Sequence, residues 1–303
     1  MIDFVGKKRW FFLASEILIL IGIISLAVFG LNPGTDFAGG TSVTLQFNPP
    51  VEQSLLRQEM ADLGYDKATI QNAGEGNYII HLREITSAKA TELAEELGKQ
   101  LDSQVKITDY YLASPTVGAE TARNAGIAVI VAAVAMLFYI VWAFRRMPKP
   151  FRWGVCAIIA LLHDVFIIVG IFSILGKVAG VEIDAMFITG LLAVVGYSIN
   201  NTVVIFDRIR ENVSKQISSD FAETVNISIV ETLGRSLNTS LTTLFVVLAL
   251  FLFGGATIHY FVLVLLLGVI IGTYSSLCVS SQLLVVWEKK EWSKLLPFAK
   301  RPT

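Results

Sequence analysis

Residues 153–175 read WGVCAIIALLHDVFIIVGIFSIL, and apart from His163 and Asp164 this run contains no acidic or basic side chain. About 20 predominantly apolar residues suffice to cross the hydrocarbon core of a bilayer as a helix. The run therefore predicts a membrane-spanning helix. An ionisable group inside such a helix is costly to bury, so His163 and Asp164 are candidates for function. The alternative is a hydrogen-bonded pair that only holds two helices together.

Five similar runs lie on either side of this one and predict further spanning helices, the last of them long enough to be tilted or interrupted. Composition agrees, because 54% of the 303 residues are hydrophobic and only 16% are charged, whereas a soluble domain carries about a quarter of charged residues. The chain is therefore too apolar for a soluble or a disordered protein. We predict a polytopic α-helical membrane protein with six transmembrane helices, the other five at residues 11–29, 125–144, 185–206, 237–253 and 259–287.

Lysine and arginine residues gather in four short segments between or beside these runs. The positive-inside rule places such segments in the cytoplasm. We therefore expect a multi-pass protein of the cytoplasmic membrane with both termini inside and the segment after the first span outside. The net charge of −1 gives no overall basic field to attract nucleic acid, which is therefore not an expected partner. The predicted spans make the bilayer an expected partner. The basic residues are Lys7, Lys8 and Arg9; Arg145, Arg146, Lys149 and Arg152; Arg208, Arg210, Lys215 and Arg235; and Lys289, Lys290, Lys294, Lys300 and Arg301.

The charge pattern divides the chain into four parts. Residues 1–35 form a cytoplasmic N-terminus and the first span, and residues 36–120 form a domain outside the cytoplasm. Residues 121–287 form the membrane domain, including a cytoplasmic amphipathic segment at 208–235. Residues 288–303 form a cytoplasmic tail.

The outer segment is polar enough to fold outside the membrane. Its patterns predict the order βαββαβ, a ferredoxin-like α+β arrangement. His81 lies within a strand pattern and suits a structural role, and no acid pair or nucleophile triad can be assembled. A binding or spacing role therefore fits this domain better than catalysis. The expected strands are at residues 41–47, 67–71, 77–82 and 105–112, and the expected helices at 51–63 and 87–101.

The cytoplasmic half of the fourth run is unusually polar. Gly196 and Ser198 permit close helix approach, but Asn200 and Asn201 exceed what packing needs. Asp207 and Arg208 would lie at the interface, where solvation and topology account for charges.

A polar and amphipathic stretch follows the fourth run. Residues 222–233 predict a helix along the membrane surface, with Val225, Ile229 and Leu233 on one face. Arg235 comes next and is either a positive-inside anchor or an interior-facing residue, since Asn238 and several threonines continue the polar pattern. A buried arginine needs an anionic or dipolar partner, so we expect spans four and five to meet at Asn201 and Arg235.

No cofactor or metal is expected from the sequence. It contains no Walker A motif, no His-x-x-x-His pair and no G-x-S-x-G motif, and Cys156 and Cys278 lie inside apolar runs without zinc spacing. Work done by this protein would therefore draw on an ion gradient or on another subunit.

Three stretches resemble the SecF family of bacterial protein translocases, within the resistance–nodulation–division superfamily. Residues 34–40, GTDFAGG, resemble the family's GIDFxGG motif, and residues 163–165 match its HDV. Residues 196–212, GYSINNTVVIFDRIREN, are similar to the signature GYSINDTVVVFDRIREN. The resemblance covers nearly the whole chain. It implies that Asp36, Gly39, Gly40, Gly196, Asp207 and Arg208 are structural positions of the family motifs.

The resemblance also implies a function. It implies a non-enzymatic subunit that assists late, proton-motive-force-driven export of secreted polypeptides across the bacterial inner membrane. Its implied partners are a SecD homologue, with which it forms a twelve-helix unit, the SecYEG channel and the preprotein substrate. Arg235, Asn201, Asp164, His163 and Asn200 are the implied candidates for proton passage.

Position 201 departs from the family pattern, because an aspartate stands there in the signature. An asparagine amide does not titrate near neutral pH. Three explanations stay open. The proton path runs elsewhere, for example through Asp164 or the partner, or Asn201 is an introduced substitution that mimics a protonated carboxyl. The third is that proton coupling is weak or lost. Two other functions stay open, a structural subunit without coupling and a small-molecule or lipid exporter half of the superfamily. The short outer segment argues against an exporter.

Overall fold

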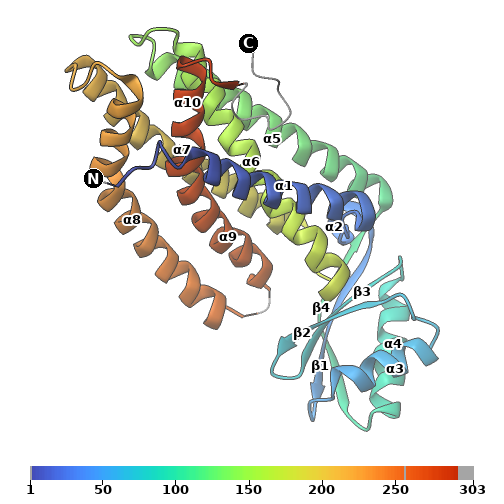
Figure 1. Cartoon of the computed structure of the whole chain (residues 1–303). Helices are drawn as coiled ribbons and strands as arrows, with labels where there is room; N and C mark the ends of the chain where they lie inside the picture. Colours follow the sequence, from blue (N-terminus) through green and yellow to red (C-terminus); the bar gives the residue numbers. More distant parts are fainter. Residues whose placement is uncertain (1, 256, 293–303) are drawn as a thin grey trace.

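The computed structural model describes residues 2–255 and 257–292 (Figure 1). Within this part, six helical stretches are long and apolar enough to cross a membrane, which confirms the predicted architecture. The spans in α6, α7 and the last stretch are about half buried inside the chain, whereas α1, α5 and α8 lie at its periphery. The stretches are α1 (Lys8–Phe29), α5 (Pro115–Ala143), α6 (Pro150–Ala179), α7 (Ala185–Ser214), α8 (Phe221–Phe253) and His259–Glu288.

The last stretch is interrupted near its middle. It consists of α9 (His259–Ser275), one π-helical turn (Ser276–Ser280) and α10 (Ser281–Glu288). The hydroxyls of Ser280 and Ser281 both donate to the carbonyl oxygen of Ser276, at 2.9 and 3.0 Å. Single π-helical turns recur at functional sites, so this interruption directs attention to the helices around it.

The outer domain has the predicted order βαββαβ and follows a one-turn helix, α2 (Thr35–Ala38). Its four strands are antiparallel in the order β2-β3-β1-β4, and α3 and α4 cover one face of the sheet (Figure 1). Val43, Leu45 and Phe47 of β1 are buried in its core, as their alternation predicts. The elements are β1 (Gly40–Asn48), α3 (Gln53–Asp62), β2 (Thr69–Gly74), β3 (Asn77–Leu82), α4 (Ser87–Gln100) and β4 (Gln104–Ala113).

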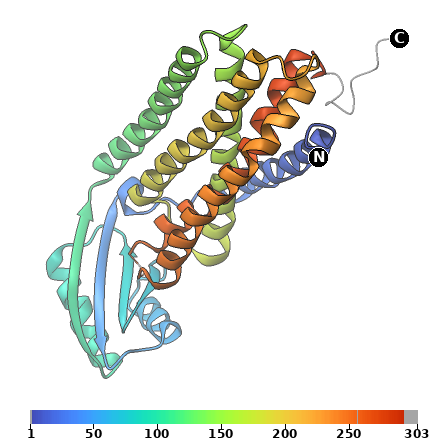
Figure 2. The ribbon, with the colours of Figure 1, turned by 90° about the vertical axis from the view of Figure 1, so that its left-hand side faces the viewer.

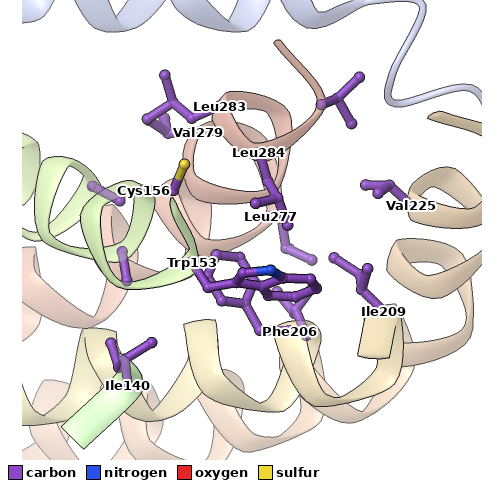
Figure 3. Packing of buried hydrophobic residues seen from close by; sticks show 14 of the residues in the cluster. Ile140, Trp153, Cys156, Phe206, Ile209, Val225, Leu277, Val279, Leu283 and Leu284 are labelled. Atoms are coloured by element: carbon purple, nitrogen blue, oxygen red, sulfur yellow. The ribbon is translucent and has the colours of Figure 1, made fainter. Parts of the chain in front are cut away.

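The largest apolar core lies at the end of the bundle away from the outer domain (Figures 1 and 3). There Trp153 of α6 stacks on Phe144, with ring centroids 5.2 Å apart, and meets Phe206 of α7 edge to face at 5.3 Å. Cys156 lies in the same core and is a free thiol. The core therefore joins α6, α7 and α10 at the end of the bundle opposite the outer domain.

The first and last described residues lie close together at this end of the bundle. The side-chain amide of Asn226 in α8 accepts from the backbone N–H of Phe4 and donates to the carbonyl of Ile2. Lys8 forms an ion pair with Glu291 beyond α10. The described N- and C-terminal residues thus lie on one side of the bundle, and the outer domain lies at the other end (Figure 2).

The fifth span differs from its predicted form. Residues 222–233 do not lie apart as a surface helix, because they form the first turns of the single helix α8. Asp220 caps its start by accepting from the backbone N–H of Ala222, and no proline interrupts it. Thr224, Val225, Ser228 and Ile229 are buried against the bundle, so tertiary packing of the apolar face holds this segment.

Candidate functional site

The buried carboxylate of Asp164 is the centre of the polar interior. Its side chain is 2% exposed, and three helices converge on it. Ser198 of α7 and Ser275 of α9 both donate to Oδ2, at 2.6 and 2.7 Å, and Oδ1 lies 2.8 Å from Nδ1 of His163. A buried carboxylate needs such donors because it has lost its hydration. Helices α7 and α9 therefore each place a serine hydroxyl next to the carboxylate that α6 carries.

Only one ring nitrogen of His163 contacts Asp164. Its Nδ1 faces Asp164, its ring lies 6.3 Å from the ring of Tyr274, and its Nε2 is buried without a hydrogen-bond partner. A carboxylate at Nδ1 favours the tautomer that carries the proton there. Nε2 is then a free acceptor. The predicted pair is thus a contact between neighbours that leaves one imidazole nitrogen without a partner among the described residues.

A second layer of hydroxyls lies beside the carboxylate. Thr202 Oγ1 and Ser276 Oγ are 3.0 Å apart, and Ser276 also donates to the carbonyl of Ser198 at 3.3 Å. Tyr197 and Thr273 both donate to Ser240 Oγ, at 3.0 and 2.6 Å. These contacts join α7, α8 and α9, so the polar residues of the fourth and sixth runs form one connected interior.

Asn201 lies next to this interior, whereas Asn200 and Gly196 face outward. Asn201 is 3% exposed, and its Nδ2 has no hydrogen-bond partner within the described residues. Asn200 and Gly196 are exposed on α7, and a Cβ added to Gly196 would meet no atom within 4 Å. Gly196 therefore makes no close helix contact with the described residues.

The expected meeting of Asn201 and Arg235 is not observed. Arg235 is exposed on α8, and its guanidinium makes no hydrogen bond or ion pair with the part of the chain that the structure describes. The polar pattern beyond it is satisfied within the helix, since Thr239 donates to the carbonyl of Arg235 and Thr243 to that of Thr239. The threonines after Arg235 therefore do not mark a face of α8 that points into the bundle.

The charges at the end of α7 make helix contacts. Arg208 donates to Glu231 of α8 at 2.7 Å and to Glu211 at 2.6 Å, so it connects the two helices. Asp207 pairs with Arg210 one turn away at 2.6 Å. Asp207 matches the expectation of a solvated charge, but Arg208 also fixes α7 against α8.

The glycine-rich turn after α1 anchors the outer domain to the bundle. Asp36 Oδ2 accepts from the backbone N–H of Ala185 at 3.0 Å and so caps α7 together with Asp184. A Cβ on Gly39 would lie 2.7 Å from the backbone nitrogen of Pro115, and one on Gly40 would lie 2.5 Å from the carbonyl oxygen of Leu82. The turn therefore needs both glycines, and it connects α2, β1, β3, α5 and α7.

Several buried polar atoms in the helices have no hydrogen-bond partner within the described residues. Besides His163 Nε2 and Asn201 Nδ2, these include Ser236 Oγ and both polar atoms of Gln282, whose side chain is fully buried. Buried polar groups are normally hydrogen-bonded to protein or water, so these positions require water or another polar partner. Sequence reasoning missed Ser275 and Gln282. The run YSSLCVSSQ at residues 274–282 was the available signal, because so many hydroxyls are unusual in an apolar span.

This arrangement places a buried carboxyl group beside a buried imidazole. The described residues contain no group of three or more His, Cys, Asp or Glu side chains suited to a metal ion. Asp164 and His163 are the only ionisable side chains of the described spans that are buried and polar, apart from the thiols.

Comparison with known proteins places this architecture in a family. The family model described as "Protein export membrane protein SecD/SecF, C-terminal" matches residues 93–290, and the one described as "SecD/SecF GG Motif" matches residues 24–51. The Protein translocase subunit SecF of Thermobaculum terrenum is 43% identical and is covered over 96% of its length by 97% of this chain. That of Anaerolinea thermophila is 39% identical, with 96% of each chain covered.

A solved structure has the same fold. The crystal structure of SecDF from Thermus thermophilus, described as a translocon-associated membrane protein, aligns with a TM-score of 0.84 at 36% identity. The alignment covers 95% of this chain and 39% of that one. These relatives support a multi-pass accessory subunit of Sec protein export. The chain belongs to the SecD/SecF family of protein-export membrane proteins.

Proposed function

We propose that this chain is a proton-coupled subunit that helps secreted polypeptides to complete their passage through the bacterial inner membrane. In this proposal both termini are cytoplasmic, the ferredoxin-like domain lies outside, and a SecD homologue and the SecYEG channel are the partners. The outer domain holds or pulls the emerging preprotein while protons pass through the helices. No step is enzymatic, because the driving force is the proton gradient.

The observation that carries the proposal is the carboxylate of Asp164 inside the bundle. It has hydrogen-bond partners on three helices and an adjacent imidazole with one free nitrogen. An ionisable pair at this depth is costly and is typical of proton relays. The unpartnered atoms of Asn201, Ser236 and Gln282 on the neighbouring helices α7, α8 and α10 suit a line of water that would connect this pair to one side of the membrane.

The exposed residues Gly196, Asn200 and Arg235 support a partner half. Arg235 lies 18 residues before the end of α8, about 27 Å along its axis, so it is near one edge of the hydrocarbon core. A guanidinium there needs an anionic or dipolar partner, and this chain offers none within the described residues. In the SecDF of Bacillus subtilis, the region like this chain is 39% of the whole protein. A second half on this face would supply the missing partner.

Replacing Arg235 with alanine is expected to lower preprotein export about tenfold or more in cells that depend on this chain. The loss corresponds to one charge-assisted hydrogen bond across the partner interface, roughly 1.5–3 kcal/mol. Arg235→Lys should restore part of the activity, because it keeps the charge without the planar fork. The measurement is the amount of a mature secreted protein at equal membrane levels of the variants.

The matched control is Lys215→Ala, which removes another exposed cation at the same end of the helices. Lys215 makes only a surface ion pair with Glu211, at 2.6 Å. Such pairs contribute about 0–1 kcal/mol, so export should be unchanged. Normal export by Arg235→Ala would show that the guanidinium has no role in translocation.

A structural subunit without proton coupling is the second candidate function, and Asn201 favours it. An amide is found where the family signature has a titratable carboxyl, and its Nδ2 has no partner. Proton flux into liposomes, measured with the partner half present and with or without a secreted polypeptide, distinguishes the two candidates. A flux equal to that of empty liposomes would support the structural role.

Asn201→Asp is expected to increase proton-linked activity. The substitution keeps the size of the side chain and adds a titratable group to a 3% exposed position beside the hydroxyl layer. We expect a several-fold higher flux in the same liposome assay. Gln216→Glu is the control, since it adds an exposed carboxyl just after the end of the same helix and should change the flux little. Equal flux from Asn201→Asp and the unchanged chain would mean that coupling does not run through this position.

A further inference from the structure

A cavity between the outer domain and the membrane helices is lined by acidic and aromatic side chains. Its volume is about 410 Å³, which is enough for a whole arginine or lysine side chain. One wall is the face of the sheet that α3 and α4 leave uncovered, with Ser42, His81 and Asp109 among its residues. The other wall is formed where α7 and α9 begin, by Asp184 and Tyr260 among others.

Four carboxyl groups line this cavity, those of Asp36, Asp109, Glu182 and Asp184. None of its described lining residues is a lysine or an arginine. Asp36 and Asp184 accept from backbone N–H groups at the start of α7, and Asp109 is exposed on β4. Like charges that gather on separate elements repel one another, so the cavity favours a positively charged occupant.

Glu182 is a buried carboxyl group of this cavity that lacks a donor. Its side chain is only 10% exposed, and its Oε2 has no hydrogen-bond partner within the described residues. Nδ1 of His81 lies 3.5 Å from that oxygen. Burial lowers the pKa of His81, opposed by the charge of Asp36, so this imidazole is neutral at pH 7 and does not balance a carboxylate. Buried polar atoms of folded proteins normally have a partner, so Oε2 indicates a donor from outside the described residues.

The electrostatics of Glu182 agree with a missing cation. Burial raises its pKa to about 7, with the hydroxyl of Thr69 opposing this effect and the charge of Asp184 adding to it. A positive neighbour favours the charged form of a carboxyl group. A cation in the cavity and the ionised Glu182 would therefore stabilise each other.

The other lining side chains indicate which cation fits. Tyr111, Tyr260 and Phe261 line the same cavity, and aromatic faces attract guanidinium and ammonium groups. A metal ion needs several closely placed ligands, and the described residues contain no group of three or more His, Cys, Asp or Glu side chains suited to one. A guanidinium has a planar fork of N–H donors, which carboxylates on separate elements can share. The cavity therefore suits an organic cation, and arginine better than lysine.

We propose that this cavity binds a basic side chain, preferentially arginine, of the polypeptide that emerges on the outer side of the membrane. The source of that side chain rests on the proposed function. The membrane potential, which is negative inside, opposes the outward movement of each positive side chain. A site that binds the side chain after it has crossed offsets part of this cost and hinders its return. The outer domain thus holds the emerging polypeptide by its charge.

Binding is tested on the full chain in phosphatidylcholine nanodiscs, whose lipids have no net charge that attracts the probe. The probe is a short glycine–serine peptide with blocked ends and one central arginine. The matched probe carries citrulline, which has the shape of arginine without its charge. Dissociation constants are measured by saturation-transfer NMR at pH 8, above the pKa of about 7 for Glu182.

We expect the citrulline peptide to bind at least about tenfold more weakly than the arginine peptide, because charge-assisted hydrogen bonds are lost. Binding of the arginine peptide should also weaken as the salt concentration rises. Equal binding of the two peptides would overturn the proposal.

Three variants locate the binding. Glu182→Gln keeps the size of the side chain but removes the buried charge, and should weaken binding of the arginine peptide about tenfold. Asp109→Lys places an ammonium group at the cavity and should abolish detectable binding. Glu95→Gln removes an exposed carboxyl of α4, on the covered side of the sheet, and should bind like the unchanged chain. Binding that neither cavity variant alters would overturn the proposal, and thermal unfolding confirms that the variants are folded.

The source of the side chain is tested by repeating the titration with the partner half present. Retained binding supports the emerging polypeptide as the occupant. Loss of binding would show that a side chain of the partner fills the cavity and would overturn the proposal. The titration needs no proton gradient, so a chain that binds the arginine peptide but shows no proton flux would contradict only the proposed coupling.

Discussion

Replacing Asp164 with asparagine is expected to reduce proton-linked export to the level measured without a proton gradient. The substitution keeps the volume of the side chain but removes the only buried carboxylate of the described spans. Two serine hydroxyls donate to Oδ2, at 2.6 and 2.7 Å, and an amide nitrogen at that position cannot accept from them. The amide also cannot take up a proton near neutral pH, so a relay through this residue would be interrupted.

The stability cost should be moderate for asparagine and large for leucine. Asp164→Asn keeps one acceptor oxygen and can turn it toward one of its partners, at a cost of about 1–3 kcal/mol. Asp164→Leu leaves Ser198, Ser275 and His163 without a buried acceptor and should cost roughly 3–5 kcal/mol. Thermal unfolding in detergent measures both values. The comparison of the two variants shows whether loss of export follows loss of the proton site or loss of the fold.

Proton flux and export are measured together on membranes that contain the partner half. Asp207→Asn is the matched control, because Asp207 is exposed and pairs only with Arg210 in the next turn. Its flux and export should equal those of the unchanged chain. If Asp164→Asn retains full proton-linked export, Asp164 is a packing residue and the proton path must lie in the partner.

Hydropathy and charge segregation were sufficient to predict the fold. The six spans and the βαββαβ domain are confirmed because long apolar runs and alternating strands report directly on their surroundings. The first turns of α8 were assigned wrongly, because only their amphipathic pattern was available to place them. Amphipathic periodicity shows that residues 222–233 have one apolar face, but it does not say whether a membrane surface or the bundle covers it.

Only part of the candidate site could be predicted from the sequence. Asp164 and His163 stand out as charges in an apolar run, whereas Ser198 and Ser275 are nearly neutral in hydropathy and come from helices distant in sequence. The pairing of Asn201 with Arg235 was inferred from chemistry alone. It is not observed within the described residues, because Arg235 is exposed on α8 whereas Asn201 is buried in the bundle.

Gly40→Ala is expected to loosen the connection between the outer domain and the helices. Gly40 has φ +126°, which side-chain-bearing residues rarely adopt, and a Cβ there would lie 2.5 Å from the carbonyl oxygen of Leu82. That oxygen is backbone within the sheet, where Leu82 pairs with Thr41, so it cannot give way cheaply. Strained backbone and steric overlap together should lower the free energy of unfolding of the outer domain by about 2–5 kcal/mol.

Gly64→Ala separates the two causes. Gly64 also has a positive φ, +86°, but a Cβ there meets no atom within 4 Å. It therefore reports the cost of backbone conformation alone, about 1–2 kcal/mol. Amide hydrogen exchange of β1 and β3 measures both variants, and Gly40→Ala should accelerate it far more than Gly64→Ala does. Equal acceleration would mean that the contact with Leu82 is not what requires glycine at position 40. The glycines of the turn would then be needed only for its backbone conformation.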